Sequence, residues 1–267
     1  MSIENAIGRL APEIVEFKAG QVWLAGAGPG NAGQLTLDVV SALAQAEAIV
    51  YDALVDPSIL KAADGADLHF VGKRGGKPST PQDDITALLI ALAGRGKRVL
   101  RLKGGDPYVF GRGGEEAMAL ARAGIPFRIL PGVTSAFGAL ASAGIPATMR
   151  GLNKAIILAT GHAAGEPEDI DWAALARTGQ PIVVYMGLRR LGTIAAALRA
   201  GGLAAATPAA VIAAATTEGE TVLVSTLADI AREAAASGVA SPALIVVGEI
   251  VSMRAELGQF VKLVKSA

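Results

Sequence analysis

Short apolar segments alternate with helical segments along most of this chain, and this alternation limits the possible folds more than any other feature. The expected strands are 22–25, 48–51, 68–71, 98–102 and 127–130, then 155–159, 182–185, 209–213, 222–225 and 243–247. Helical patterns separate most of them. Strands that alternate with helices favour parallel sheets, because a parallel connection needs a crossover that a helix supplies. We therefore predict an α/β fold, with chemistry in the loops that follow the strands.

The regular pattern is interrupted once, where Pro146 and Gly151 lie in a stretch with little periodicity. We predict a linker at 146–153 that joins two α/β domains. The expected division is an N-terminal extension (1–19), an N-terminal α/β domain (20–145), the linker and a C-terminal α/β domain (154–267).

The composition excludes several kinds of site and partner. The chain has no cysteine and only two histidines, His69 and His162, so disulfides, thiolate metal sites and a cysteine nucleophile are excluded and no metal is expected. Lys+Arg and Asp+Glu both number 24, so bulk charge favours neither nucleic acid nor an anionic membrane. No apolar run is long enough for a bilayer, and the acidic start is unlike a signal peptide. We expect a soluble, cytoplasmic protein.

A glycine-rich loop, Ala25-Gly26-Ala27-Gly28-Pro29-Gly30-Asn31, follows the first expected strand. With Asp52 after the second strand, it suggests a nicotinamide-dependent oxidoreductase. Two details count against that interpretation: Asn31 stands where the third glycine belongs, and Pro29 lacks the backbone N–H that a pyrophosphate needs. A tight turn without a ligand is the other alternative.

The most informative stretch runs from Arg101 to Glu116, between a strand and a helix. Gly104 and Gly105 permit backbone conformations that other residues avoid. Glu115 and Glu116 fall in the first helical turn, where the helix dipole favours carboxylates, and for Glu116 capping is the preferred interpretation.

Basic residues follow several of the expected strands. We define the basic cluster as Lys73, Arg74, Lys77, Arg101, Lys103, Arg112, Arg150 and Lys154. Together these side chains would suit a polycarboxylate substrate, through charge-assisted hydrogen bonds. Scattered surface charge is the alternative.

Together these motifs resemble the tetrapyrrole methylase family. The resemblance covers Val22 to about Val251 and rests on 26–31, 51–52, 72–74 with 81–82, 101–116, 131–135, 143–146, 160–162, 185–187 and 242–249. It implies two α/β domains with an active-site cleft between them, and a homodimer. It implies that S-adenosylmethionine methylates uroporphyrinogen III at C2 and C7, giving precorrin-2 through precorrin-1 and leaving S-adenosylhomocysteine. The product would enter cobalamin, sirohaem or haem d1 synthesis. A methylase of a later precorrin intermediate is the nearest alternative, and a non-catalytic tetrapyrrole-binding protein is another.

The resemblance also implies site residues. The positions that match cofactor contacts are Pro29, Gly104, Gly105, Asp106, Val109, Thr134, Ser135, Met186, Ala215 and, more weakly, Ala243. Those that match substrate or proton-transfer positions are Asp52, Lys73, Arg112, Glu115 and Arg150, with Asp52 as the first choice of proton acceptor. From the residues alone, an alternative stays open for three of these positions. Thr134 and Ser135 could be simple helix caps, and Met186 could be a simple core residue. The chain departs from the family pattern at Met149 and at Lys77-Pro78-Ser79-Thr80.

Overall fold

The chain divides into two compact units, Met1–Thr134 and Ser135–Ala267. The structure is a computed structural model, and it describes residues 3–10, 15–72, 80–162 and 169–261. Lys73, Arg74 and Lys77-Pro78-Ser79 therefore lie outside the described residues. Within the part of the chain that is described, no helix is both long and apolar enough to cross a bilayer.

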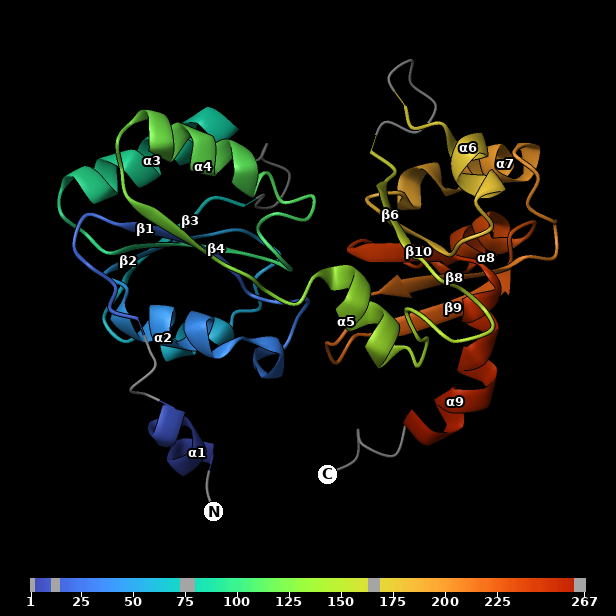
Figure 1. Ribbon diagram of the computed structural model, residues 1–267, viewed down its shortest axis with the longest axis horizontal. Helices are drawn as coiled ribbons and strands as arrows, with labels where there is room; N and C mark the ends of the chain where they lie inside the picture. Colours follow the sequence, from blue (N-terminus) through green and yellow to red (C-terminus); the bar gives the residue numbers. More distant parts are fainter. Residues whose placement is uncertain (1–2, 11–14, 73–79, 163–168, 262–267) are drawn as a thin grey trace. The chain divides into compact units, whose positions relative to one another are not determined.

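The first unit contains a five-stranded parallel sheet in the order β3-β2-β4-β1-β5 (Figure 1). Its elements are α1 (Ile3–Leu10), β1 (Val22–Gly26), η2 (Ala32–Gln34), α2 (Leu37–Gln45), β2 (Ala48–Tyr51), η3 (Ile59–Ala62), β3 (Asp67–Phe70), α3 (Gln82–Gly94), β4 (Val99–Lys103), α4 (Gly113–Arg122) and β5 (Phe127–Leu130). The strands predicted at 48–51 and 127–130 have these bounds. The parallel sheet of the N-terminal α/β prediction is confirmed.

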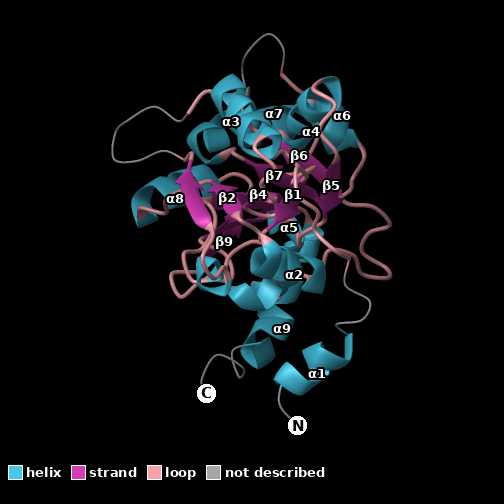
Figure 2. Ribbon diagram, turned by 90° about the vertical axis from the view of Figure 1, so that its left-hand side faces the viewer, coloured by secondary structure: helices cyan, strands magenta, loops and turns pink. Residues whose placement is uncertain are grey.

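Helices cover both faces of this sheet, with α2 on one face and α3 and α4 on the other (Figures 1 and 2). Alternate residues of each strand serve the two layers: Trp23 packs with the α2 side, while Leu24 packs with Leu89 and Leu120 of α3 and α4. Burial on both faces explains why β1 and β2 read as continuous apolar runs. The loops of interest lie at the edge where the strands end.

The second unit contains a mixed sheet in the order β6-β7-β10-β8-β9. Its elements are α5 (Ser135–Ser142), β6 (Ile157–Thr160), α6 (Trp172–Arg177), β7 (Ile182–Tyr185), η4 (Leu188–Arg190), α7 (Leu191–Ala200), β8 (Pro208–Ala213), β9 (Thr221–Thr226), α8 (Ile230–Ser237), β10 (Ala243–Val247), η5 (Glu249–Ser252) and α9 (Met253–Val261). Only β6 and β7 pair in parallel, and the other pairs are antiparallel. The α/β content matches the prediction, whereas the strand directions differ from a wholly parallel sheet.

The division between the units falls before α5, earlier than the linker expected at 146–153. Helix α5 contacts β10, and the backbone N–H of Ala136 donates to the Tyr185 hydroxyl at 3.0 Å. The stretch 146–153 is itself organised by Asn153, which is buried. Its Oδ1 accepts from Met149 N, and its Nδ2 donates to the carbonyls of Ala147 and Ala155. Both segments thus belong to the second unit.

Candidate functional site

Three loops meet backbone to backbone at the carboxyl edge of the first sheet. They follow β1, β4 and β5 and carry Gly26, Gly105 and Gly132. A Cβ on Gly26 would lie 2.4 Å from the Gly105 oxygen, and one on Gly132 would lie 2.3 Å from the same oxygen. No side chain fits at these positions. The glycines therefore create a close-packed backbone surface at the centre of this edge.

The glycine loop after β1 is bonded to the loop after β4 and then enters η2. Gly28 and Gly105 exchange two backbone hydrogen bonds, of 3.1 and 2.7 Å. Asn31 accepts a hydrogen bond from Gly33 N at 2.9 Å and so caps η2. Asn31 thus replaces the third Rossmann glycine with a side-chain cap, which explains the departure from the dinucleotide pattern.

Asp106 joins the loop after β4 to the loop after β5. Its Oδ1 accepts from Tyr108 N at 2.8 Å, and its Oδ2 accepts from Gly132 N at 3.0 Å. Gly104 approaches the turn after β2, because a Cβ there would lie 2.7 Å from the Leu54 Cβ. Five of the cofactor candidates, Pro29, Gly104, Gly105, Asp106 and Val109, thus belong to loops at the same edge of the sheet.

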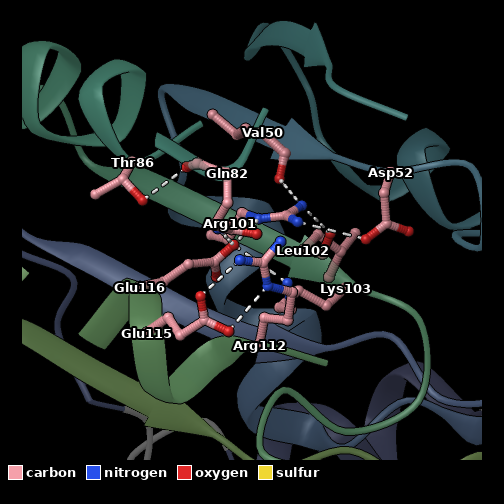
Figure 3. A network of polar contacts seen from close by, with 10 residues as sticks. All are labelled: Val50, Asp52, Gln82, Thr86, Arg101, Leu102, Lys103, Arg112, Glu115 and Glu116. Carbon is pink, nitrogen blue, oxygen red and sulfur yellow. Dashed lines mark hydrogen bonds and ion pairs between the residues drawn. The ribbon is translucent and has the colours of Figure 1, made fainter. Parts of the chain in front are cut away.

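A network of buried charges lies beside this edge and centres on Glu116 (Figure 3). The Glu116 side chain is 0% exposed, Arg101 is 3% and Lys103 is 6%. The Oε1 atom of Glu116 accepts from Arg101 Nε at 3.1 Å, from Lys103 Nζ at 3.2 Å and from Gln82 Nε2 at 2.9 Å. The preferred interpretation of Glu116 as a helix cap is wrong. Arg101 and Lys103 also do not belong to an exposed basic cluster, because both are buried and form ion pairs with Glu116.

A helical spacing in the sequence could have revealed Glu116. Gly113, Glu116, Ala117 and Leu120 are the buried residues of α4, and they follow the i, i+3, i+4, i+7 pattern of one helix face. A carboxylate on that face needs a buried cation, and β4 supplies two.

The environment of Lys103 disfavours its charged form. Burial lowers the pKa of this ammonium and the neighbouring Arg101 lowers it further, while Glu116 and Asp52 act in the opposite direction. The balance of these effects is a pKa of Lys103 below its ordinary value.

Asp52 lies where β2 ends, and both of its oxygens have donors. Its Oδ1 accepts from Leu54 N at 3.1 Å, and its Oδ2 lies 3.5 Å from Arg101 NH2. The carboxylate is partly exposed, at 25%. The turn at Leu54, which directly follows Asp52, therefore contacts Gly104. The charge of Asp52, the expected proton acceptor, is balanced by the buried Arg101.

Arg112 and Glu115 form an exposed pair at the start of α4, with both side chains 57% exposed. Arg112 Nε and NH2 donate to the two carboxylate oxygens of Glu115 at 2.9 and 2.6 Å. The hydrogen bond from Arg112 lowers the pKa of Glu115, and the pairing raises the pKa of Arg112. Arg112 also has a left-handed backbone, with φ of 59°, which is uncommon outside glycine. The structure therefore brings the candidates Arg112 and Glu115 together as an ion pair with each other.

The second unit brings another set of candidates to one edge of its sheet. Met186 follows β7, Ala215 lies in the β8–β9 hairpin and Ala243 begins β10, which lies between β7 and β8. Met186 is 53% exposed, so it is not a core residue. Ser135, at the start of α5, precedes Ala136, which is bonded to Tyr185 beside Met186.

Left-handed backbone also occurs at non-glycine residues of this second edge. Met186, Ala214 and Thr216 have φ values of 54°, 47° and 64°. Such conformations in non-glycine residues are often found at ligand sites, where the surrounding structure maintains them. The sequence carried no signal for Ala214 or Thr216.

The remaining candidates occupy different positions. Thr134 is buried at the end of the first unit, and Arg150 is exposed in the turn that Asn153 organises. In the described ranges, no three His, Cys, Asp or Glu side chains are grouped so as to hold a metal ion.

The model of one protein family, the tetrapyrrole (corrin/porphyrin) methylases, matches residues 21–231. A uroporphyrinogen-III C-methyltransferase from a Sinorhizobium species is 51% identical over 244 residues, which are 90% of this chain and 87% of that protein. Siroheme synthase 1 of Yersinia enterocolitica is 47% identical over 242 residues. That match covers 90% of this chain and 51% of the synthase, so this chain spans about half of the longer protein.

Solved structures agree with the sequence matches. The crystal structure of uroporphyrin-III C-methyltransferase from Thermus thermophilus has a TM-score of 0.76 and 42% identity, and the match covers 89% of this chain and 98% of that one. A second Thermus thermophilus structure, complexed with S-adenosyl homocysteine, has a TM-score of 0.74 and 37% identity over 87% of this chain and 99% of that one. On the family match, the sequence identities and the shared fold, this chain belongs to the tetrapyrrole methylase family.

Proposed function

We propose that this protein transfers the methyl group of S-adenosylmethionine to C2 and then C7 of uroporphyrinogen III, giving precorrin-2. The observation that carries the proposal is 51% identity, over most of both chains, to a uroporphyrinogen-III C-methyltransferase. The close-packed glycine loops and the buried charge network support it, because both lie where ligands bind in parallel α/β sheets.

In the first unit, the candidate residues fit a sulfonium cofactor better than a dinucleotide. Gly104, Gly105 and Asp106 present backbone and one carboxylate where a phosphate would need basic side chains or free N–H groups, and both Asp106 oxygens already accept backbone hydrogen bonds. In the second unit, exposed Met186 offers an adaptable apolar surface. When bound, S-adenosylmethionine supplies an electrophilic methyl group.

The chain then has to orient an electron-rich pyrrole carbon, exclude water and take up a proton. Orientation and exclusion of water supply much of the acceleration in such a reaction. We assign proton acceptance to the partly exposed carboxylate of Asp52, whose Oδ2 lies 3.5 Å from Arg101 NH2. Arg112, Arg150 and Lys73 are assigned to the substrate carboxylates, and Glu115 fixes the direction of Arg112. We further propose that the enzyme acts in the cytoplasm as a homodimer.

The experiment that tests the proposal is anaerobic incubation with uroporphyrinogen III and S-adenosylmethionine, followed by mass spectrometry. We expect products that carry one and then two added methyl groups. A chain that leaves uroporphyrinogen III unmethylated but methylates a later precorrin intermediate would establish the alternative activity instead.

A further inference from the structure

The buried network contains a continuous connection from Glu116 to Asp52. Arg101 lies between them: its Nε donates to Glu116 Oε1 at 3.1 Å, and its NH2 is 3.5 Å from Asp52 Oδ2. The remaining nitrogen, NH1, donates to the backbone carbonyls of Val50 and Leu102 at 3.3 and 3.1 Å. Every nitrogen of this guanidinium therefore has an acceptor (Figure 3).

A guanidinium is planar, and its donors form a rigid fork, so its contacts on different sides are coupled in direction. Its two carbonyl contacts are to the strands β2 and β4. On the Nε side of the guanidinium, the acceptor is Glu116 Oε1. Loss of the Glu116 charge would weaken its contact with Arg101 Nε, and with it the position of Arg101 relative to Asp52 Oδ2.

The charges of the network also balance. Arg101 and Lys103 carry two positive charges when ionised, and Glu116 and Asp52 carry two negative charges. Glu116 is the fully buried member of this set, so Asp52, at 25% exposure, is the carboxylate that faces the site. A buried ion of either sign needs such compensation.

We infer that Glu116 is a positioning residue for methyl transfer: it orients Arg101, and Arg101 in turn holds the carboxylate of Asp52 at the edge of the sheet. This inference rests on the proposed function, in which Asp52 accepts the proton. It extends the site to a residue that touches neither cofactor nor substrate.

A double-mutant cycle on turnover tests the connection. Glu116→Gln keeps the volume and removes the charge, and we expect kcat to fall roughly ten- to a hundredfold with the affinity for S-adenosylmethionine nearly unchanged. In an Asp52→Asn background, the same substitution should cause no further loss, because the group that it positions is gone. Losses that multiply in the double variant would mean that Glu116 acts independently of Asp52, and the inference would be wrong.

Glu47→Gln is the matched control. Glu47 forms an ion pair with Arg98 at 3.6 Å, just before β2 and β4 begin, at the opposite edge of the same two strands. We expect Glu47→Gln to leave kcat unchanged. An equal loss in this variant would show that weakened strands, not positioning, lower turnover.

A spectroscopic measurement separates this inference from the proposed function. In protein labelled with ¹³C-aspartate, the carboxyl signal that Asp52→Asn removes is that of Asp52. We expect Glu116→Gln to shift this signal and Glu47→Gln to leave it in place, whether or not the parent methylates uroporphyrinogen III. An unmoved signal in folded Glu116→Gln overturns the inference. If that variant does not fold, Glu116→Gln combined with Lys103→Met restores the charge balance, and the same two measurements apply to it.

Discussion

At the carboxyl end of β2, the backbone N–H of Leu54 and the guanidinium of Arg101 leave the Asp52 carboxylate little freedom to rotate. Asp52→Asn keeps the shape and removes the base. We expect turnover to fall at least about a hundredfold, the scale of general-base catalysis, while cofactor affinity changes little. Single-turnover methyl transfer and calorimetric titration with S-adenosylhomocysteine measure the two quantities. Unchanged turnover would mean that Asp52 only ends a strand.

Met186 shows how exposure decides between two interpretations of an apolar side chain. It is 53% exposed and has a left-handed backbone, so a polar substitution should not unfold the protein. We expect Met186→Lys to abolish cofactor binding while the melting temperature stays within a few degrees of the parent. Met186→Leu keeps volume and polarity and should be mild. Full cofactor binding by Met186→Lys would remove Met186 from the site.

The backbone at the ends of β1, β4 and β5 packs together closely, because Gly26 and Gly132 both lie against the Gly105 oxygen and leave no space for a side chain. Gly26→Ala would place a Cβ 2.4 Å from the Gly105 oxygen, against backbone that cannot rotate away. We expect a loss of about 1–3 kcal/mol in the free energy of unfolding, together with weakened cofactor binding. Urea unfolding and calorimetry measure both.

Gly94→Ala is the control for that substitution. Gly94 lies in α3, and an added Cβ there would meet no atom within 4 Å beyond the adjoining helical backbone, so the change should stabilise the helix by roughly 0.5–1 kcal/mol. Equal effects of the two substitutions would show that loop packing is not what limits Gly26.

For the whole molecule, zero net charge means that a polycarboxylate substrate must be bound by a few local cations. We expect Arg112→Ala and Arg150→Ala each to weaken substrate use by about 1.5–3 kcal/mol, or roughly ten- to a hundredfold, with cofactor affinity intact. Raised salt should weaken substrate binding in the parent more steeply than in either variant. Steady-state kinetics at several salt concentrations measure this.

Arg122→Ala provides the comparison, because Arg122 is an exposed arginine at the far end of α4 from Arg112. It should change neither substrate use nor its salt dependence. If Arg112→Ala, Arg150→Ala and Arg122→Ala all use the substrate as well as the parent does, Arg112 and Arg150 are ordinary surface charges.

The stability of the whole chain should depend on pH through Lys103. The folded protein lowers the pKa of this group from its ordinary value of 10.5, so the unfolded chain binds the proton more tightly. Between the lowered pKa and 10.5, the contribution of Lys103 to the free energy of unfolding therefore rises with pH. Below that range Lys103 is charged in both states, and the free-energy cost of burying its charge is fully present. We expect the parent to gain stability relative to Lys103→Met as the pH rises through this window. Urea unfolding at several alkaline pH values would contradict this if the difference between the two proteins stayed constant.

Much of the fold could be predicted because burial leaves a local mark. The strands at 48–51, 127–130, 182–185 and 243–247 were predicted with the bounds that the structure has, and all but 127–130 are uninterrupted apolar runs that the fold buries. The strand ends also indicated which loops carry polar candidates, and the first-unit loops do meet at one edge. Local sequence determines these features because they depend on neighbours a few residues apart.

Only the tertiary structure decided the partners of the charged side chains. In the sequence, Arg101, Lys103 and Arg112 belong to one basic pattern. The fold directs Arg101 and Lys103 inward to Glu116 and leaves Arg112 outside on Glu115, because β4 is central in the sheet and α4 lies across it. The strained backbone at Met186, Ala214 and Thr216 likewise arises where β7 and β8 end beside the start of β10. The sequence by itself determined which residues form the strands and loops. Which charges are buried was decided by contacts between residues distant in the chain, because desolvation depends on what packs above a side chain and not on its neighbours in sequence.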